Sequence, residues 1–101
     1  STDLRDRLEA NTRHYRAALK AAGFDIPASD HPIVPILLGD ARRAQAMAER
    51  LLAEGIYVVA FSYPVVPEGK ARIRTQVSAV HTADQLDRVV EAFARARQAV
   101  G

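Results

Sequence analysis

The sequence predicts an α+β fold, in which three helices pack against a three-stranded, mainly antiparallel sheet. Three observations lead to this prediction. The chain has 101 residues, of which 49% are hydrophobic, and this length is typical of one domain with one core. Segments near both ends carry apolar residues at helical spacing, whereas the middle holds short β-branched and aromatic runs. Isolated Gly and Pro residues separate these segments, so the expected order is helix, strand, helix, strand, strand, helix.

Residues 2–22 form the first expected helix, because apolar side chains recur on one side of it. These side chains are Leu4, Leu8, Tyr15 and Leu19. Gly23 is expected to end the helix, since glycine adopts the left-handed conformation common after a last turn. The residues able to cap its start are Ser1, Thr2 and Asp3.

Residues 33–38 form the first expected strand, and residues 41–54 the second helix. Pro35 lacks a backbone N–H, which suits a strand at the edge of a sheet. Asp40 is expected to cap the helix and Gly55 to end it. The predicted apolar stripe of this helix consists of Ala44, Met47, Ala48, Leu51 and Leu52.

Two further strands are expected, a buried one at 56–61 and a third at 71–77, joined by a turn with two prolines and Gly69. Alternation along the third strand places Ile73, Thr75 and Val77 on one face and Arg72, Arg74 and Gln76 on the other. A right-handed crossover makes the first two strands parallel, and a hairpin reverses the third. Placing the third strand between the other two therefore makes every neighbouring pair antiparallel.

The last expected helix begins at a capping box formed by Thr82 and Gln85. Its apolar stripe consists of Leu86, Val89, Val90, Phe93 and Val100. The sequence shows no internal repeat and no second domain boundary, so residues 1–101 are expected to form a single domain.

Composition narrows the class of protein. The 14 basic and 12 acidic residues give a net charge of +2, which does not indicate a nucleic-acid partner. No apolar stretch approaches the roughly 20 residues that span a bilayer, so we expect no membrane partner. The absence of cysteine is compatible with a reducing compartment, and we expect the cytoplasm. Because the chain opens directly into a helix without an initiator Met, we expect a segment of a longer protein.

The sequence lacks the residue patterns of several kinds of functional site. The three histidines are far apart in sequence and have no Cys partners, so we predict no metal site; they are His14, His31 and His81. No glycine-rich loop follows a strand, so no phosphate cradle is expected. The helical arginines are interleaved with acids, as on a solvated surface; they are Arg42, Arg43, Arg50, Arg88, Arg95 and Arg97.

Arg74 is the candidate functional residue that the pattern singles out. It lies in the middle of a strand, where the backbone holds it in place. Its planar guanidinium can donate two parallel hydrogen bonds to a carboxylate. The alternative is a surface residue paired with an acid on a neighbouring strand.

Residues 55–81 read GIYVVAFSYPVVPEGKARIRTQVSAVH, and this segment resembles the C-terminal signature of the α-oxoamine synthase family, most closely its glycine-acetylating branch. Three flanking segments resemble the same domain: LRDRLEANTRHYRAALKAAGF, HPIVPILLGD and HTADQLDRVVEAF. The resemblance therefore covers essentially all 101 residues. It implies that the chain is the small C-terminal domain of a fold-type I enzyme dependent on pyridoxal phosphate.

The resemblance also implies where the chemistry lies. The cofactor would be held by a lysine of a large domain that precedes this segment, and neither Lys20 nor Lys70 resembles that lysine. We therefore expect no cofactor on the fragment, no catalytic residue within it, and no activity from it alone. In such enzymes an arginine of the small domain binds the amino-acid carboxylate, and here it corresponds to Arg74. The full-length protein is expected to be a homodimer that takes glycine and acetyl-CoA.

The loop at 63–70 resembles the family loop that borders the thioester entrance. Some relatives carry a basic residue where this chain has Glu68, so the resemblance does not indicate that this loop binds the CoA phosphate through charge. Val65 stands where aminolevulinate synthases tend to have Thr, which favours the acetyl-transferring branch. An alternative from a different class stays open: a free-standing α+β module that binds a small carboxylate or self-associates, without catalysis.

Overall fold

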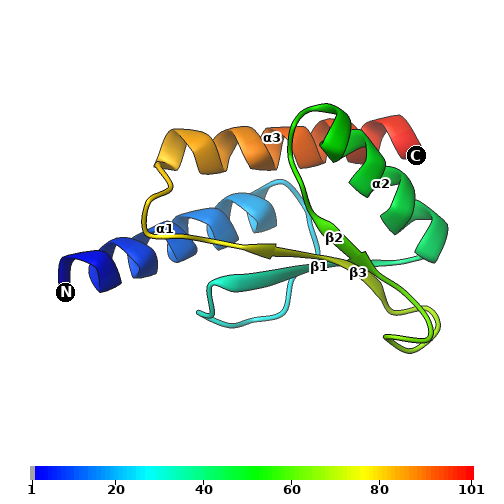
Figure 1. Ribbon diagram of the computed structural model, residues 1–101, viewed down its shortest axis with the longest axis horizontal. Helices are drawn as coiled ribbons and strands as arrows, with labels where there is room; N and C mark the ends of the chain where they lie inside the picture. Colours follow the sequence, from blue (N-terminus) through cyan, green and yellow to red (C-terminus); the bar gives the residue numbers. More distant parts are fainter. Residues whose placement is uncertain (1) are drawn as a thin grey trace.

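The computed structural model describes residues 2–101, which form three helices and one three-stranded sheet (Figure 1). The elements are α1 (Thr2–Ala21), β1 (Ile33–Gly39), α2 (Ala41–Ala53), β2 (Val59–Phe61), β3 (Ala71–Gln76) and α3 (Ala83–Val100). The strand order is β1-β3-β2, and both neighbouring pairs are antiparallel. The predicted α+β fold, element order and central third strand are therefore confirmed.

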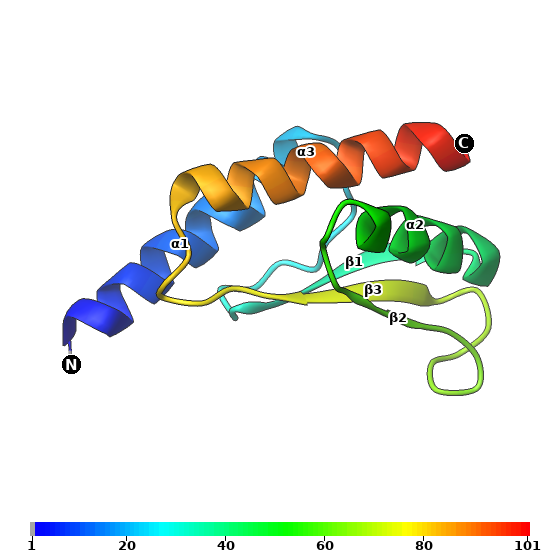
Figure 2. The same ribbon diagram turned by 45° about the horizontal axis from the view of Figure 1, so that its top comes forward.

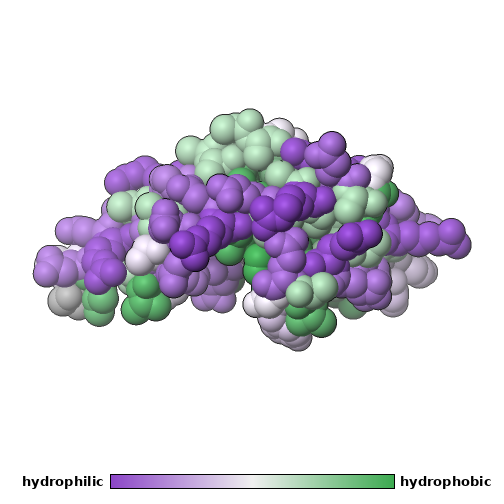
Figure 3. Space-filling view, turned by 90° about the horizontal axis from the view of Figure 1, so that it is seen from above, coloured by the Kyte–Doolittle hydropathy of each residue, from purple (hydrophilic) through white to green (hydrophobic). Residues whose placement is uncertain are grey.

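All three helices lie on the same face of the sheet (Figure 2). Between them and the strands lies one apolar core, in which the largest fully buried apolar side chains are Tyr15, Leu19, Val34, Ile36, Met47, Leu51, Ile73 and Phe93. Seen from above, the helical layer shows mostly hydrophilic side chains, with paler apolar patches among them (Figure 3). The opposite face of the sheet carries no helix, so the molecule has one covered and one open face.

The predicted caps position the helices. The Asp40 side chain accepts a hydrogen bond from the N–H of Arg42, and the capping box of Thr82 and Gln85 is complete at the start of α3. Gly23 follows α1 with a φ of 86°, a conformation that side-chain-bearing residues rarely adopt. Ser1, one of the predicted caps of α1, lies outside the described residues.

The prediction for residues 56–61 was wrong in length and burial. Only Val59–Phe61 form a strand, and its residues are half-buried because β2 is an edge strand. The N–H of Ile56 donates instead to the carbonyl of Leu51 at 2.8 Å, and this bond closes the last turn of α2. Tyr57 is 80% exposed. The chain pairs with β3 only from Val59 onward.

Two leucines of the predicted apolar stripes are exposed. Leu4 is 51% exposed, because the first turns of α1 extend past the end of the sheet (Figure 1, blue). Leu52 is 58% exposed, since it lies one position beyond the buried Leu51 on α2. Within residues 2–101, no helix combines the length and the apolar character needed to cross a membrane.

Candidate functional site

The register of the sheet defines the residues of the open face. Arg74 lies opposite Pro35 of β1 and Val59 of β2, so these three side chains share a face. The neighbouring Ile73, on the other face, is fully buried. The open face as a whole consists of Ile33, Pro35, Leu37, Val59, Phe61, Arg72, Arg74 and Gln76. The predicted separation of the two faces of β3 is confirmed.

Arg74 is exposed, and its guanidinium contacts an aromatic ring rather than an acid. Its Cζ atom lies 5.1 Å from the centroid of the Phe61 ring. Among residues 2–101, the acidic side chains that form ion pairs do so with other residues: His14, Arg88 and Arg95. The N–H groups at the edge of the Arg74 guanidinium therefore remain available to a carboxylate.

Arg72 differs from Arg74 although both lie on the open face. It is half-buried, and its Nε donates to the carbonyl of Lys70 at 3.1 Å. This bond ties Arg72 to the turn that precedes β3. The geometry thus distinguishes an arginine with a structural partner from one whose donors are free.

A half-open cavity of about 500 Å³ lies beside Arg74. It occupies the gap left where the chain before Val59 diverges from β3, and α3 forms its other side. Its lining is mainly apolar, with a few polar groups; it includes Tyr15, Ile56, Val58, Thr75, His81, Gln85, Leu86 and Val89. A cavity of this size and character is typical of small-molecule sites.

Tyr15 and Thr75 fix the floor of this cavity. The Tyr15 hydroxyl donates to the Thr75 Oγ1 at 2.9 Å, and Thr75 in turn donates to the carbonyl of Val34 at 2.9 Å. Burial raises the pKa of Tyr15 to about 12, which outweighs the lowering by the Thr75 hydrogen bond. The phenol therefore stays protonated at neutral pH and acts as a structural donor.

The three histidines have structural partners. The Nδ1 atoms of His81 and His31 accept hydrogen bonds from the N–H groups of Ser78 and Ile33, both at 3.0 Å. His14 Nε2 lies 2.7 Å from Asp87 Oδ1, which links α1 to α3. In the described part of the chain, no three His, Cys, Asp or Glu side chains come together as metal ligands.

The residues of this chain do not by themselves fit a site for pyridoxal phosphate. A cofactor lysine needs an enclosed position beside groups that hold the phosphate. Lys20 on α1 and Lys70 in the turn before β3 are both exposed.

Solved structures of serine palmitoyltransferases contain this fold. A variant of the enzyme from S. paucimobilis with bound PLP-myriocin aldimine aligns with a TM-score of 0.89 at 35% identity, over 99% of this chain and 26% of that one. The enzyme of Sphingomonas wittichii aligns with a TM-score of 0.91 at 28% identity, over 98% and 25%. The fold is therefore that of a domain of the fold-type I enzymes that use pyridoxal phosphate.

The chain belongs to the aminotransferase class I and II family, whose match covers residues 1–93. It is 55% identical to 2-amino-3-ketobutyrate coenzyme A ligase of Escherichia coli (strain K12), over 99% of this chain and 25% of that protein. It is 56% identical to the mitochondrial form from Homo sapiens, over 85% and 20%. Identity to 8-amino-7-oxononanoate synthase of Symbiobacterium thermophilum is 43%, over 95% and 24%. The chain spans about a fifth to a quarter of the length of these relatives.

Phe61 and the Tyr15–Thr75 contact were not predicted from the sequence. Alternation alone places Phe61 and Val59 on one face of β2. The pairing of β2 with β3 decides which of them reaches Arg74, and the turn at 62–70 sets that register. The spacing along β2 therefore indicated that Phe61 and Val59 share a face, but it did not indicate which of them contacts Arg74.

Proposed function

We propose that this chain is the C-terminal small domain of a glycine C-acetyltransferase dependent on pyridoxal phosphate. The observation that carries the proposal is the 55% identity to 2-amino-3-ketobutyrate coenzyme A ligase over 99% of the chain. The lower value of 43% for 8-amino-7-oxononanoate synthase favours this branch. The reaction would join glycine and acetyl-CoA to give 2-amino-3-oxobutyrate and CoA, as in threonine breakdown.

In this proposal Arg74 binds the carboxylate of glycine. Two parallel charge-assisted hydrogen bonds from the guanidinium would hold the carboxylate plane and so orient the bonds at the glycine Cα. The new carbon–carbon bond forms between that Cα and the acetyl carbonyl carbon. The thioester C–S bond breaks, and CoA leaves as a thiol with the proton that the Cα has lost.

The rest of the enzyme would lie outside these 101 residues. We propose that a preceding large domain supplies pyridoxal phosphate and its lysine, and that the enzyme is a cytoplasmic homodimer. The loop at 63–70 would border the path of acetyl-CoA, beside a cavity of about 450 Å³ that is lined by Asp40, Tyr63 and Glu68, among others. Glu68 has the wrong charge to bind CoA phosphates, so this loop would act by shape.

The test is an assay of CoA release by the full-length protein that contains this chain, purified with pyridoxal phosphate. Glycine with acetyl-CoA should be the preferred pair, compared with L-serine and palmitoyl-CoA and with L-alanine and acetyl-CoA. A preference for L-serine and palmitoyl-CoA would overturn the proposal.

The isolated 101-residue chain provides the matched control. It should release no CoA from acetyl-CoA and glycine, even with added pyridoxal phosphate, because neither of its lysines is enclosed. Turnover by the isolated chain would contradict its role as a partial domain and favour a self-sufficient module.

A further inference from the structure

We propose that Phe61 is a positioning residue for Arg74: its ring holds the face of the guanidinium and leaves the N–H groups at the edge free for a substrate carboxylate. This inference rests on the proposed function, because it assumes that Arg74 binds the carboxylate of glycine. It adds a residue on β2 whose effect on substrate would pass entirely through Arg74.

The pairing of the strands brings the two side chains together. Phe61 lies directly opposite Arg72, and Val59 lies opposite Arg74, so Phe61 is the diagonal neighbour of Arg74 on the open face. Diagonal neighbours on one face of a sheet are within reach of aromatic and long side chains. The separation of 5.1 Å from Cζ to the ring centroid lies within the range of cation–π contacts.

An aromatic ring is suited to this task because it occupies a different part of the guanidinium from a carboxylate. The ring attracts the cation through its face, whereas a carboxylate accepts hydrogen bonds in the guanidinium plane. An acidic neighbour would hold Arg74 equally well but would compete with substrate for the same donors. Contact with the ring also restricts a side chain that carries a large rotamer entropy, so substrate binding has less disorder to remove.

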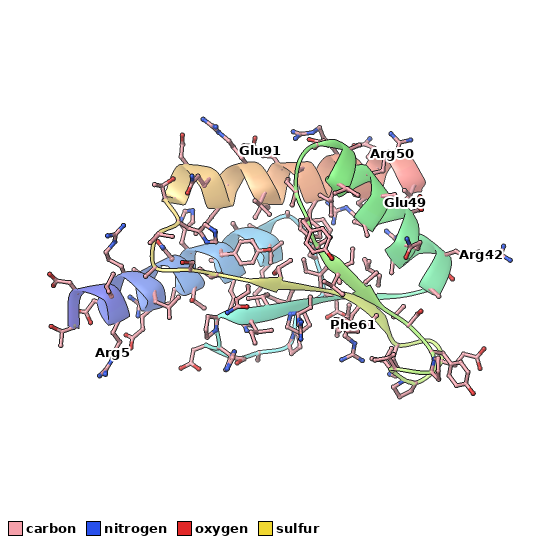
Figure 4. All side chains as sticks on the ribbon, in the orientation of Figure 1. Arg5, Arg42, Glu49, Arg50, Phe61 and Glu91 are labelled. Carbon is pink, nitrogen blue, oxygen red and sulfur yellow. The ribbon has the colours of Figure 1, made fainter. Side chains whose placement is uncertain are left out.

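Phe61 is not required by the apolar core. The ring is half-buried on the open face, where the neighbouring side chains are those of the sheet itself. Figure 4 labels it below the sheet, on the opposite side from Glu91 of α3 and Arg50 of α2. The side chains that pack against the core from β2 and the segment before it are Ala60, Val58 and Ile56. A change at Phe61 therefore tests the contact with Arg74 more than it tests folding.

A second Arg–Phe pair contrasts with the contact between Arg74 and Phe61. The Cζ atom of Arg97 lies 4.1 Å from the centroid of the Phe24 ring. Phe24 is 7% exposed and packs edge-to-face on Phe93 at 5.9 Å, so that pair belongs to the core. Phe24→Leu is thus a matched control, which removes an Arg–Phe contact remote from the open face.

The experiment compares Phe61→Leu, Phe61→Tyr and Phe24→Leu in the full-length holoenzyme. For Phe61→Leu we expect the KM and the dissociation constant for glycine to rise about 2- to 30-fold, with the KM for acetyl-CoA unchanged. Phe61→Tyr keeps a ring and should restore glycine binding to within about 2-fold of wild type. Phe24→Leu should lower thermal stability without changing the affinity of the folded enzyme for glycine.

A double substitution shows whether Phe61 acts through Arg74. On an Arg74→Ala background, Phe61→Leu should weaken glycine binding no further, because the group that it positions is gone. Additive losses would overturn the proposal, and so would an unchanged glycine affinity in Phe61→Leu or failure of Phe61→Tyr to restore it.

Calorimetric glycine binding separates this proposal from the proposed function. If wild type binds glycine but makes no product, the proposed function fails alone, and the same variants still test Phe61. If wild type does not bind glycine, both proposals fall.

Discussion

Neighbouring residues of β3 contact entirely different surroundings on the two faces of the sheet. On the covered face, Ile73 is fully buried among helical side chains, and Thr75 accepts a hydrogen bond from Tyr15 of α1. On the open face, Arg74 is exposed and contacts the Phe61 ring. Successive side chains of a strand point to opposite faces, so one short strand can serve folding with one set of residues and binding with the other.

The difference between the two faces explains why Arg74 on the open face needs no acidic partner. Three helices bury the apolar side of the sheet and supply the stability of the domain. The open side then needs no ion pair to hold it, and a side chain there can be selected for a ligand. Substitutions on the covered face should therefore change stability, and those on the open face should change binding.

The largest effect on stability is expected at Ile73. Ile73→Ala removes a fully buried side chain and should lower the free energy of unfolding by about 2–5 kcal/mol. Arg74→Ala, one residue further along β3, should change it by no more than about 0.5 kcal/mol. Urea unfolding of both variants measures the two values. Equal losses would remove the distinction between the faces.

A second test concerns the buried phenol of Tyr15. Its pKa is about 12 in the folded chain and about 10 when unfolded, so its contribution is complete below pH 10 and is lost as the pH rises from 10 to 12. At pH 11 wild type should have lost about 1 kcal/mol through this group. Tyr15→Phe should not show that loss. At pH 8 the same substitution should lower stability by about 1 kcal/mol, because it removes the hydrogen bond to Thr75.

Urea unfolding of wild type and Tyr15→Phe at pH 8 and pH 11 makes this comparison. Tyr57 and Tyr63 are exposed and present in both proteins, so they do not contribute to the difference. A stability difference that is the same at both pH values would show that the phenol is not held in its neutral form by the fold.

A smaller effect is expected at the start of α3, which helps to cover the sheet. Thr82→Ala removes the side chain that accepts a hydrogen bond from the N–H of Gln85 and should cost about 1 kcal/mol. For a chain of this size that corresponds to a fall in Tm of roughly 4–8 °C. Gln98→Ala, an exposed change on the same helix, is the control and should leave Tm almost unchanged. A loss of glycine affinity in full-length Thr82→Ala would contradict the separation of the faces.

Local signals were enough to predict most of the fold. The capping residues Asp40 and Thr82 and the alternation along β3 each act through neighbours in sequence, and each is confirmed. The strand at 56–61 was mispredicted because Ile56 is still held in the cap of α2 and pairing with β3 begins only at Val59, which residue preferences do not express. Leu4 lies on the predicted apolar side of α1 but is exposed, because helical periodicity gives the direction of a side chain and not whether another element covers it.

The site could be predicted only in part for a related reason. Alternation predicted that the side chains of Arg74 and Ile73 lie on opposite faces of the sheet, and this prediction is confirmed. Its contact with Phe61 depends on the register between two strands, which a turn of nine residues sets and which no local pattern specifies. The role of Arg74 toward a carboxylate stays a prediction, and one substitution tests it.

The most direct measurement is the dissociation constant for glycine of the full-length enzyme carrying Arg74→Lys. Lysine keeps the charge but loses the two-pronged geometry, so glycine should bind about 5- to 150-fold more weakly, with acetyl-CoA binding little changed. Arg72→Lys is the matched comparison, because Arg72 is tied to the carbonyl of Lys70, and its effect should be under about 2-fold. Wild-type affinity in Arg74→Lys, with the loss appearing in Arg72→Lys instead, would contradict the account and transfer the role to Arg72.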